Sequence, residues 1–528
     1  MLWERIIPRF FVLRGVTDTT TGYPKLTIVL TTLNARYIHA SLGLRYLRAN
    51  MGNLQAQTSI KEFIINQAPA DIAEQLLALN PTIIGFGVYI WNVAQVTEVA
   101  ALLKRIAPEI ILIVGGPEVS YEWTEQPLTD HADYLITGAA DQSFARLCRD
   151  IMGGARPKNK IVESAFVAPT DLALPYDEYT EEDIAHRLIY VEASRGCPFK
   201  CEFCLSALDK TAWPFDLERF LAAMDRLHRR DVRHFKFVDR TFNLKVETGE
   251  RILQFFLDRL DERLFLHFEV IPDRLPDRLK NLIARFPAGS LQFEIGIQTL
   301  NPTVQDHISR RQDNAKSLDN LRWLRQHSHA HLHVDLIAGL PGEDLTSFGR
   351  GFDQLNACDP HEIQVGILKR LRGAPIARHT QAFDLRFNPA PPYNILSTRD
   401  MSFQTLQRIQ RFARYWDMIA NSGRFSATKS LLLADAPFAR FMQLSDWIHA
   451  NGGQTHGIAL MRLFDMVHRA LTEVLDVARR DADHVLQIDF ERSGLKGRPS
   501  FLDTSPLPKS RPQSAEKSLS SRQSRHLG

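Results

Sequence analysis

The stretch Ser194-Arg195-Gly196-Cys197-Pro198-Phe199-Lys200-Cys201-Glu202-Phe203-Cys204 decides how this sequence is interpreted. It holds three of the five cysteines of the chain, in the spacing C-x3-C-x2-C, directly after a predicted strand. Three thiolates on a tight loop can bind three irons of a four-iron–four-sulfur cluster, which leaves the fourth iron with an open coordination position. A substrate can bind at such a position, as it does in catalytic metal sites.

The alternative for this loop is a structural zinc site. A closed zinc site has four protein ligands, however, and the next cysteine in sequence after the loop is Cys358. Cys148 lies on an apolar helical face and is predicted to pack in a core. Five cysteines in 528 residues are also too few and too unevenly placed for the disulfide framework of a secreted protein.

Strand and helix patterns alternate from Leu188, just before the cysteine stretch, onward. Six β/α units are too few to close an eight-stranded barrel, so they predict an open partial barrel with its site at the carboxyl ends of the strands. The predicted strands are Leu188–Glu192, His234–Val238, Phe265–Val270, Leu291–Gly296, His331–Leu336 and Glu362–Ile367.

A second alternation precedes the cysteine stretch. Its strands are almost continuously apolar, which is typical of a parallel sheet covered on both faces. Five such strands between Leu26 and Ile136 predict a doubly wound, flavodoxin-like sheet. In such a sheet, ligands bind beyond the carboxyl ends of the strands. The predicted strands are Leu26–Thr31, Thr58–Ile65, Ile83–Val88, Ile110–Val114 and Tyr134–Ile136.

The chain is therefore predicted to be an α/β protein with a helical C-terminal region. After about residue 400 the strand patterns fade, and the Ser/Pro/Lys/Arg-rich end contains few apolar residues. The predicted parts are a leader at 1–24, a doubly wound domain at 25–150, a linker at 151–185, the partial barrel at 186–400, a helical domain at 401–495 and a disordered tail at 496–528.

Composition excludes several classes of protein. Hydrophobic residues make up 44% and charged residues 24%, as in ordinary globular chains. The net charge of 64 − 61 = +3 provides no global basic field for nucleic acid. No apolar run reaches the roughly 18–20 residues of a membrane helix. Glu4, Arg5 and Arg9 interrupt what would be the apolar region of a signal peptide, so we expect a cytoplasmic protein.

The cysteine spacing at the end of the first strand of a six-unit β/α domain resembles the radical S-adenosylmethionine (SAM) superfamily. The resemblance implies that Cys197, Cys201 and Cys204 bind a four-iron–four-sulfur cluster. It further implies that the amine and carboxylate of SAM chelate the open iron, and that reductive cleavage of SAM yields a 5′-deoxyadenosyl radical.

The same resemblance implies SAM contacts at several strand ends. Phe203 matches the aromatic residue whose backbone touches adenine, and Asp239 follows the second strand, where the family binds the methionyl part. Asp239 departs from the Gly-Gly-Glu form of many members and resembles the Asp form of the cobalamin-linked branch. Glu294 and Gln298 resemble the segment that contacts ribose and carboxylate, and Asp335–Glu343 resembles the turn beside adenine. Taken alone, each of these segments is also compatible with an ordinary turn between a strand and a helix.

The first domain resembles the cobalamin-binding domain that precedes many radical SAM domains. Small residues at its strand ends let a bulky ligand approach the backbone, and a helix start offers free N–H groups to phosphate. The Asp-x-His-x-x-Gly motif that supplies an axial histidine is absent, and Gly138-Ala139-Ala140-Asp141 replaces the family's Gly-Glu-Gly-Glu turn. The implied cobalamin contacts are Asn34, Arg36, His39, Tyr89, Gly115, Gly116, Pro117 and Glu118.

The resemblance implies an enzyme that transfers a methyl group from cobalt to an unactivated carbon, or one that catalyses a radical rearrangement or ring closure. Its substrate would be a small molecule of unidentified class, and its electron donor a protein such as flavodoxin or ferredoxin. Two alternatives remain at this point: a radical SAM enzyme whose first domain has lost cobalamin, and a metal-stabilised scaffold without enzymatic activity. A methylthiotransferase is disfavoured, because only Cys148 precedes the motif.

Overall fold

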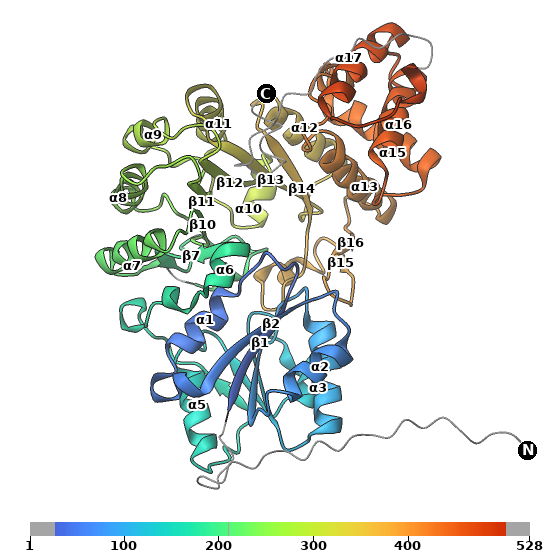
Figure 1. The fold of residues 1–528 in the computed structure, drawn as a ribbon. Helices are drawn as coiled ribbons and strands as arrows, with labels where there is room; N and C mark the ends of the chain where they lie inside the picture. The colour runs from blue at the N-terminus through green and yellow to red at the C-terminus, as the bar shows by residue number, and fades with distance from the viewer. Residues whose placement is uncertain (1–26, 210, 503–528) are drawn as a thin grey trace, which may run out of the picture.

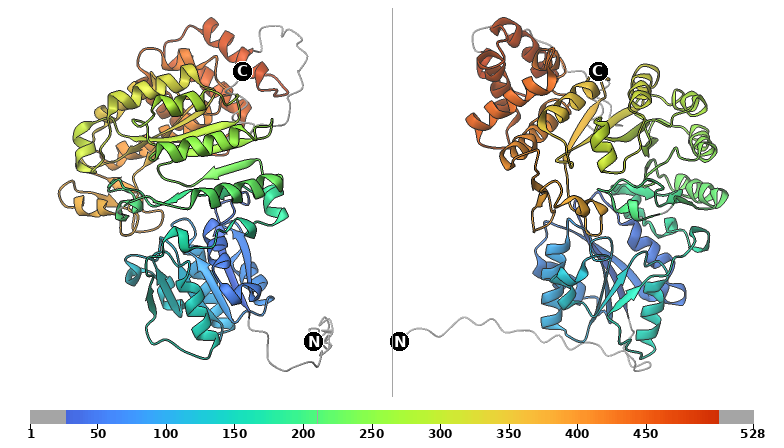
Figure 2. Two further views of the ribbon diagram at one scale, coloured as in Figure 1. Left: turned by 90° about the vertical axis from the view of Figure 1, so that its left-hand side faces the viewer. Right: turned by 180° about the vertical axis from the view of Figure 1, so that it is seen from behind.

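A computed structural model describes residues 27–209 and 211–502. The predicted leader at 1–24 lies outside the described residues, as do residues 503–528 of the predicted tail. The chain forms an N-terminal α/β domain, an open barrel above it in Figure 1, and a group of C-terminal helices beyond the barrel. The two views of Figure 2 show the N-terminal domain against the same end of the barrel from both sides.

The N-terminal domain contains a parallel six-stranded sheet in the order β2-β1-β3-β4-β5-β6. Every residue of β1 is buried, because helices cover both faces of the sheet. Apolar residues of α2, α3 and α4 pack on one face, and those of α1 and α5 pack on the other. The strands are β1 Ile28–Asn34, β2 Thr58–Ile64, β3 Ile83–Gly87, β4 Ile111–Gly115, β5 Tyr134–Thr137 and β6 Ile161–Glu163; the helices are α1 Leu42–Ala49, α2 Pro69–Leu77, α3 Val93–Ile106, α4 Leu128–His131 and α5 Ser143–Met152.

The predicted doubly wound fold is confirmed, with one strand more than the sequence indicated. Strand β6 pairs in parallel with β5 at the edge of the sheet and comes from the segment that was predicted as a linker. It has three residues and buries none of them completely, so it lacks the apolar run that marked the other strands. The remainder of that segment contains short helices, including α6 Glu181–His186.

The second domain is the predicted partial barrel. Its six strands are all parallel, in the order β14-β13-β12-β11-β10-β7, so that β7 and β14 are the edge strands. The strands are β7 Ile189–Val191, β10 His234–Phe237, β11 Phe265–Val270, β12 Leu291–Gln298, β13 His331–Ala338 and β14 Glu362–Ile367. The helices along the barrel are α7 Leu217–Arg229, α8 Val246–Leu257, α9 Asp277–Ile283, α10 Pro302–His307, α11 Asn314–His327 and α12 Leu345–Asn356.

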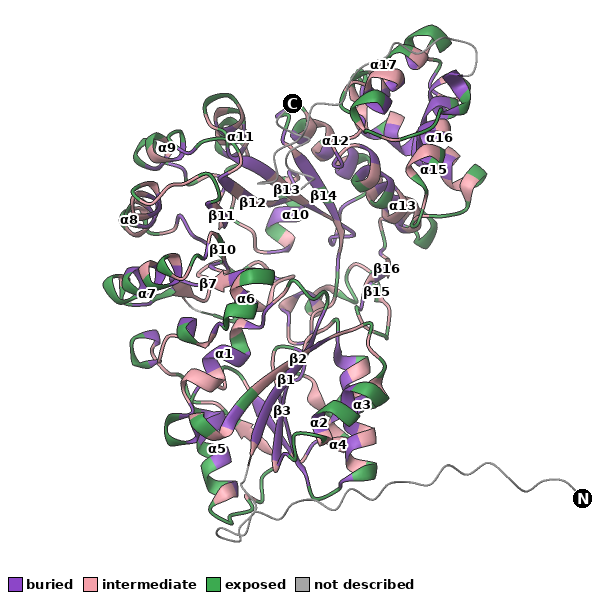
Figure 3. Ribbon diagram, in the orientation of Figure 1, coloured by how far each residue is buried: buried purple, intermediate pink, exposed green. Residues whose placement is uncertain are grey.

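Alternation along the barrel strands separates an apolar outer face from a polar inner one. In β12 buried and half-buried residues alternate, so that Phe293 and Ile295 join the core while Glu294 does not. Figure 3 shows the same pattern in the helices, whose buried faces point toward the strands and whose exposed faces point outward. Polar groups are thereby left on the inside of the barrel, where a site can form.

The C-terminal region is helical, as predicted. Its helices extend the core of the barrel domain, since the rings of Phe412 and Trp416 pack edge-to-face against those of Phe352 and Phe441. Residues 496–502 were predicted to begin a disordered tail, but Phe501 is buried here and stacks on the ring of His468. The helices are α13 Phe403–Ile419, α14 Lys429–Leu433, α15 Pro437–Gly452, α16 Leu460–Glu473 and α17 Arg479–Arg492.

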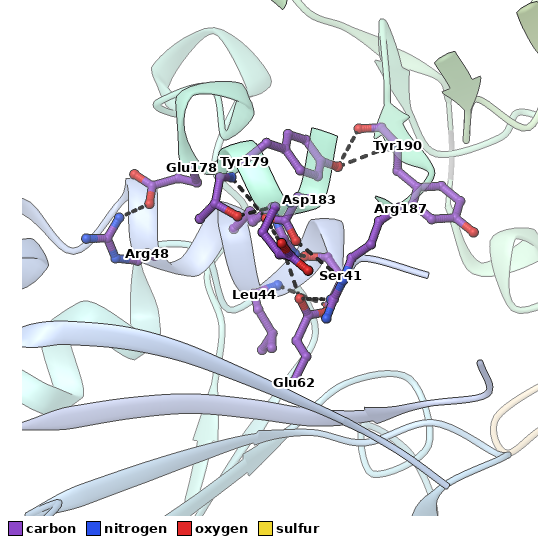
Figure 4. Close-up of polar contacts among 12 residues, drawn as sticks. Ser41, Leu44, Arg48, Glu62, Glu178, Tyr179, Asp183, Arg187 and Tyr190 are labelled. Atoms are coloured by element: carbon purple, nitrogen blue, oxygen red, sulfur yellow. Dashed lines mark hydrogen bonds and ion pairs between the residues drawn. The ribbon is translucent and has the colours of Figure 1, made fainter. Parts of the chain in front are cut away.

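Buried charges join the N-terminal domain to the barrel beside β7 (Figure 4). We call Arg45, Glu62, Asp183 and Arg187 the first docking cluster. Arg45 Nη2 lies 2.8 Å from Asp183 Oδ2 and 3.0 Å from Glu62 Oε2. Arg187 Nη1 lies 2.8 Å from Glu62 Oε2. Because each charge has an oppositely charged partner, the cluster can remain buried between α1, β2 and α6.

A second docking cluster lies beside β14 and consists of Glu118, Glu122, Arg370, Arg372 and Tyr393. Tyr393 Oη donates to Glu118 Oε1 at 2.7 Å, and Arg372 Nε lies 3.3 Å from the same oxygen. Arg370 Nη2 lies 2.8 Å from Glu122 Oε2. The two clusters therefore tie the N-terminal domain to both edges of the barrel. Among the described residues, no helix is long and apolar enough to cross a membrane.

Candidate functional site

The cysteine loop begins in a short strand, β8 Ser194–Arg195, which pairs with β9 Trp213–Pro214. Gly196 follows with φ of +95°, in the left-handed region that favours glycine. A Cβ atom on Gly196 would lie 2.5 Å from the carbonyl oxygen of Thr211. Only glycine therefore fits at this turn, and it directs the chain into Cys197.

Glu202, between the second and third cysteines, anchors the loop to the barrel. Its buried carboxylate accepts hydrogen bonds from Ser309 Oγ at 2.5 Å, Arg378 Nε at 2.7 Å and His379 Nε2 at 2.9 Å. Its backbone N–H donates to the carbonyl of Ile308 at 3.0 Å. The sequence did not assign Glu202 a role, because its partners are more than 100 residues away along the chain.

The three thiols line one cavity of about 380 Å³ at the carboxyl ends of the barrel strands. The predicted residues Phe203, Glu294 and Gln298 line it as well. Six further charged residues line its wall: Arg240, Glu269, Asp273, Arg310, Arg311 and Asp335. Asp335 opens the segment Asp335–Glu343 that resembles the turn beside adenine, whereas nothing in the sequence singled out the other five.

Asp239 does not line this cavity. Its carboxylate is buried and accepts hydrogen bonds from the backbone N–H of Ala193 at 2.9 Å and from Ser194 Oγ at 2.7 Å. Burial raises the pKa of Asp239 to about 7. The carboxylate of Asp239 thus contacts the segment that leads into the cysteine loop, while the next two residues, Arg240 and Thr241, line the cavity.

The cavity wall holds carboxyl groups in two different states. Burial favours the neutral form of Glu294, but the hydrogen bond from His267 and the nearby charge of Lys236 outweigh it and lower the pKa of Glu294 to about 2. Burial and the charges of Glu294 and Glu269 raise the pKa of Asp335 to about 8. Near neutral pH the wall therefore presents a charged acceptor at Glu294 and a protonated carboxyl group at Asp335.

The surroundings of the thiols fit an iron–sulfur cluster. Burial raises the pKa of Cys197, and so do the neighbouring thiols of Cys204 and Cys201, so three thiolates here require positive charge nearby. Arg310 Nη1 lies 3.4 Å from Cys201 Sγ and supplies one such charge. Within residues 27–209 and 211–502, no three His, Cys, Asp or Glu side chains are grouped to hold a metal ion. An iron–sulfur cluster does not require the three thiols to surround one ion, because each thiolate binds a separate iron.

The N-terminal domain has a pocket of its own, of about 280 Å³, at the carboxyl ends of β3, β4 and β5. Glycines form much of its wall. Gly116 has φ of +116°, and a Cβ there would lie 2.5 Å from the carbonyl oxygen of Val88. A Cβ on Gly85 would lie 2.7 Å from the ring of Phe144. Glycine at these two positions therefore lets the chain and the ring of Phe144 pack closely around a pocket that is lined by backbone, aliphatic and aromatic surface.

Of the eight predicted cobalamin contacts, Tyr89, Gly115 and Gly116 line this pocket. Asn34 instead donates to the carbonyl of His39 at 2.9 Å and to Glu62 Oε1 at 3.0 Å. Three other side chains do not line it either: Arg36 and Pro117 are exposed, and Glu118 belongs to the second docking cluster.

His39 also lies outside the pocket and contacts the barrel. Its Nδ1 lies 2.7 Å from the hydroxyl of Tyr190 in β7, and Leu188 N donates to Ile38 O at 2.8 Å. Burial lowers the pKa of His39, so this histidine is neutral near pH 7. Loop residues that the sequence assigned to a ligand thus serve to dock the domain, which tertiary structure alone reveals.

The pocket also contains residues that the sequence did not assign. Gly43, Gly85 and Gly87 come from the predicted strand end and helix start, so their small size was a usable indication. Arg195 comes from the other domain, and nothing in the sequence pointed to it.

Comparison with known proteins matches both cavities to described domains. Residues 191–352, which include the cysteine loop, match the Radical SAM superfamily. Residues 28–148, which form most of the N-terminal pocket, match the B12 binding domain. The chain is a radical SAM protein with a B12-binding domain. Residues 381–526 match a third family, described as a protein of unknown function (DUF4080).

Two curated relatives are named as methyltransferases. The cobalamin-dependent radical SAM methyltransferase TokK of Streptomyces tokunonensis is 25% identical over 338 residues, covering 56% of this chain and 48% of TokK. The 2-(S-pantetheinyl)-carbapenam-3-carboxylate methyltransferase of Streptantibioticus cattleyicolor is 23% identical, with the same coverage. The chain thus spans about half the length of these two relatives.

Solved structures share the fold. The radical SAM methyltransferase TsrM of Kitasatospora setae, with cobalamin and a [4Fe-4S] cluster bound, matches with a TM-score of 0.58 at 14% identity, over 89% of this chain and 100% of that one. The cobalamin-dependent enzyme OxsB, with aqua-cobalamin bound, matches with a TM-score of 0.57 at 13% identity, over 88% and 84%. The predicted family and cofactors are therefore confirmed: a four-iron–four-sulfur cluster and SAM for the radical SAM domain, and cobalamin for the B12-binding domain.

Glu343 ends the turn that is predicted to lie beside adenine, and the protonation of its carboxyl group should make the stability of the protein depend on pH. Its buried carboxyl group accepts a hydrogen bond from Thr299 Oγ1 at 2.6 Å, and burial raises the pKa of Glu343 to about 7. Since this value lies above the ordinary 4.5, the native state binds the proton more tightly than the unfolded state does. The resulting stability is present below pH 4.5 and is lost as the pH rises through 7.

We expect Glu343→Gln, which stays neutral, to remove this loss. The pKa difference corresponds to roughly 3 kcal/mol. Urea unfolding at pH 5 and pH 8 measures the effect, and the wild-type protein should lose more stability than the variant between these values. Equal losses in both proteins would contradict the assignment of a buried, neutral carboxyl group.

Proposed function

We propose that this protein is a cobalamin-dependent radical SAM methyltransferase that acts on a small molecule. One observation carries the proposal: Arg195, two residues before the cluster ligand Cys197, lines the pocket of the B12-binding domain. The two cofactor sites therefore border the same short segment of chain. The methyltransferases TokK and TsrM, which the chain resembles, support transfer of a methyl group over other radical chemistry.

The residues of the barrel cavity would hold the cluster and SAM. Cys197, Cys201 and Cys204 would ligate the cluster, and the guanidinium of Arg310 can pair with a carboxylate. Charged Glu294 accepts hydrogen bonds, and protonated Asp335 donates one. When bound, the cluster and SAM supply radical chemistry and cobalamin supplies the methyl group. The barrel walls keep water from the reacting atoms.

Anaerobic reconstitution tests the proposal. The chain should bind about four irons and one cobalt, and with a reductant such as dithionite, flavodoxin or ferredoxin it should turn over SAM. SAM labelled on its methyl group should pass the label to bound cobalamin. Iron without cobalt would favour a radical SAM enzyme that has lost cobalamin. SAM cleavage to 5′-deoxyadenosine with no label on cobalamin would favour a radical rearrangement.

Gly43 offers a specific test of the B12 pocket. It lies in the first turn of α1, and a Cβ there would lie 3.4 Å from Tyr89 Oη, which is ordinary contact distance. We expect Gly43→Leu to fill the pocket at a cost of about 1–3 kcal/mol and so to weaken cobalamin binding roughly 5- to 150-fold. Visible-absorption titration measures the affinity.

Gly43→Ala is the matched control for this test. Its added methyl group has room, so its affinity for cobalamin should stay near that of the wild-type protein. Both variants should keep their full iron content, because the cysteine loop is unchanged. If Gly43→Leu bound cobalamin as the wild-type protein does, the pocket would not be the cobalamin site.

A further inference from the structure

One wall of the pocket in the B12-binding domain comes from the radical SAM domain. The other lining residues belong to the N-terminal domain, but Arg195 lies in β8 at the start of the cysteine loop. Cys197, two residues later, lines the cavity of the barrel. A single residue, Gly196, thus separates Cys197 from the residue that lines the pocket of the B12-binding domain.

The guanidinium of Arg195 is fixed by groups from both domains. Its Nη1 donates to Asp141 Oδ2 at 2.9 Å, in the turn after β5 of the B12-binding domain. Its Nε and Nη2 donate to Glu192 Oε1 at 3.1 and 2.7 Å, just after β7. Its Cζ lies 4.6 Å from the ring centroid of Tyr46 in α1. Charge-assisted hydrogen bonds and the cation–π contact together leave the side chain little freedom.

The backbone between Arg195 and Cys197 has little freedom either. Arg195 pairs with Trp213 in the small β8–β9 sheet. Gly196 has a left-handed φ, and its Cβ position is closed by a carbonyl oxygen. On the other side, Asp239 holds the hydroxyl of Ser194. A displacement of Arg195 is therefore passed to Cys197 instead of being absorbed by a flexible turn.

We propose that Arg195 is a positioning residue that couples occupancy of the cobalamin pocket to the geometry of the cysteine loop. The inference rests on the proposed function, because cobalamin is the occupant. A ligand in the pocket excludes water from the ion pair between Arg195 and Asp141, and this lowers the local dielectric constant and strengthens the pair. The bound cofactor thereby favours one position of Arg195, and hence of Cys197.

Thermodynamic linkage makes the coupling reciprocal: the assembled cluster raises the affinity of the pocket for cobalamin by the same factor by which cobalamin stabilises the cluster. The coupling also explains why an aspartate stands at position 141. It stands in the turn that departs from the family's Gly-Glu-Gly-Glu form, and its carboxylate pairs with the other domain.

The test compares cobalamin binding to the full chain with and without its cluster, by anaerobic titration with hydroxocobalamin. In the wild-type protein the affinity should be about fivefold or more higher when the cluster is present, a usual size for coupling between sites. In Arg195→Met this ratio should fall to one. Arg195→Lys should keep part of it, because lysine can pair with one carboxylate but not with both. The g values of the reduced cluster should change on cobalamin addition in the wild-type protein and not in Arg195→Met.

Arg226→Met is the matched control, because Arg226 forms an exposed ion pair with Asp177 and lines neither cavity. If Arg195→Met does not fold, Asp141→Asn decides the matter, since it removes the pair between the domains and leaves Arg195 in place. A ratio that stays at the wild-type value in these variants overturns the inference. Equal wild-type affinities with and without the cluster overturn it while leaving the proposed function intact, whereas a chain that binds no cobalamin overturns both.

Discussion

Cys204→Ala is expected to abolish reductive cleavage of SAM and to prevent assembly of a complete cluster. Cys204 lines the barrel cavity together with Cys197 and Cys201, and the described residues offer no cysteine nearby that could replace it. Loss of one thiolate leaves an iron without its protein ligand, and an incomplete cluster cannot present an open iron to SAM. Iron analysis after anaerobic reconstitution and quantification of 5′-deoxyadenosine measure the two losses.

Cys358→Ala is the control for this variant. Cys358 is buried, and its sulfur lies 3.7 Å from the carbonyl oxygen of Gln354, away from the cavity. The substitution should keep full iron and SAM cleavage and reduce stability by about 1 kcal/mol. Full activity in Cys204→Ala, or loss of the cluster in Cys358→Ala, would contradict the assignment of the cluster ligands.

Arg45→Met is expected to cost about 3–5 kcal/mol of stability, the usual result of removing one partner from a buried ion pair. Arg45 bridges Glu62 and Asp183, whose side chains are 4% and 7% exposed. Without Arg45 the two carboxylates share only Arg187, which lies 2.8 Å from Glu62 and 3.5 Å from Asp183. Thermal unfolding measures the loss, and limited proteolysis should show earlier cleavage between the two domains.

The triple variant Arg45→Met, Glu62→Gln, Asp183→Asn should recover much of this stability, because it leaves no unpaired buried charge. Arg226→Met removes an exposed ion pair instead and should cost at most about 1 kcal/mol. If Arg45→Met unfolded like Arg226→Met, the first docking cluster would contribute little to the attachment of the domains.

Much of the fold could be predicted from the sequence because most strands are long apolar runs bounded by helix patterns. Strand β6 escaped prediction because it has three residues at a sheet edge, where pairing with β5 rather than burial defines it. The end of the helical region was also placed too early. Phe501 looks isolated in a polar sequence, but it is buried in the core of the barrel and C-terminal helices and stacks on His468.

The residues of the two cavities also divide into those that the sequence could predict and those that it could not. The cysteines and Phe203 follow the first barrel strand, and Glu294 and Gln298 lie in the second half of β12. The carboxyl ends of parallel strands meet at one edge, so the convergence of these residues could be predicted. Arg195 lines a pocket of the other domain, and sequence order carries no record of that contact.

The cobalamin assignments show the limit most clearly. Asn34, His39 and Glu118 were placed at a ligand by analogy, because they lie in the correct turns. The structure turns their side chains to Glu62, Tyr190 and Tyr393, so they support the position of the domain instead of facing the pocket. A turn can thus be identified from sequence while the direction of its side chains cannot.

The edge strands β7 and β14 do not pair with each other, so the ring of strands is open on one side. In a closed barrel the width of the mouth is set by hydrogen bonds around the whole ring. Here the N-terminal domain spans the gap and is attached by a few ion pairs at each rim and a backbone bridge between His39 and Leu188. Moving that domain away from either rim would therefore break these side-chain pairs and the one bridge, but no ladder within either sheet.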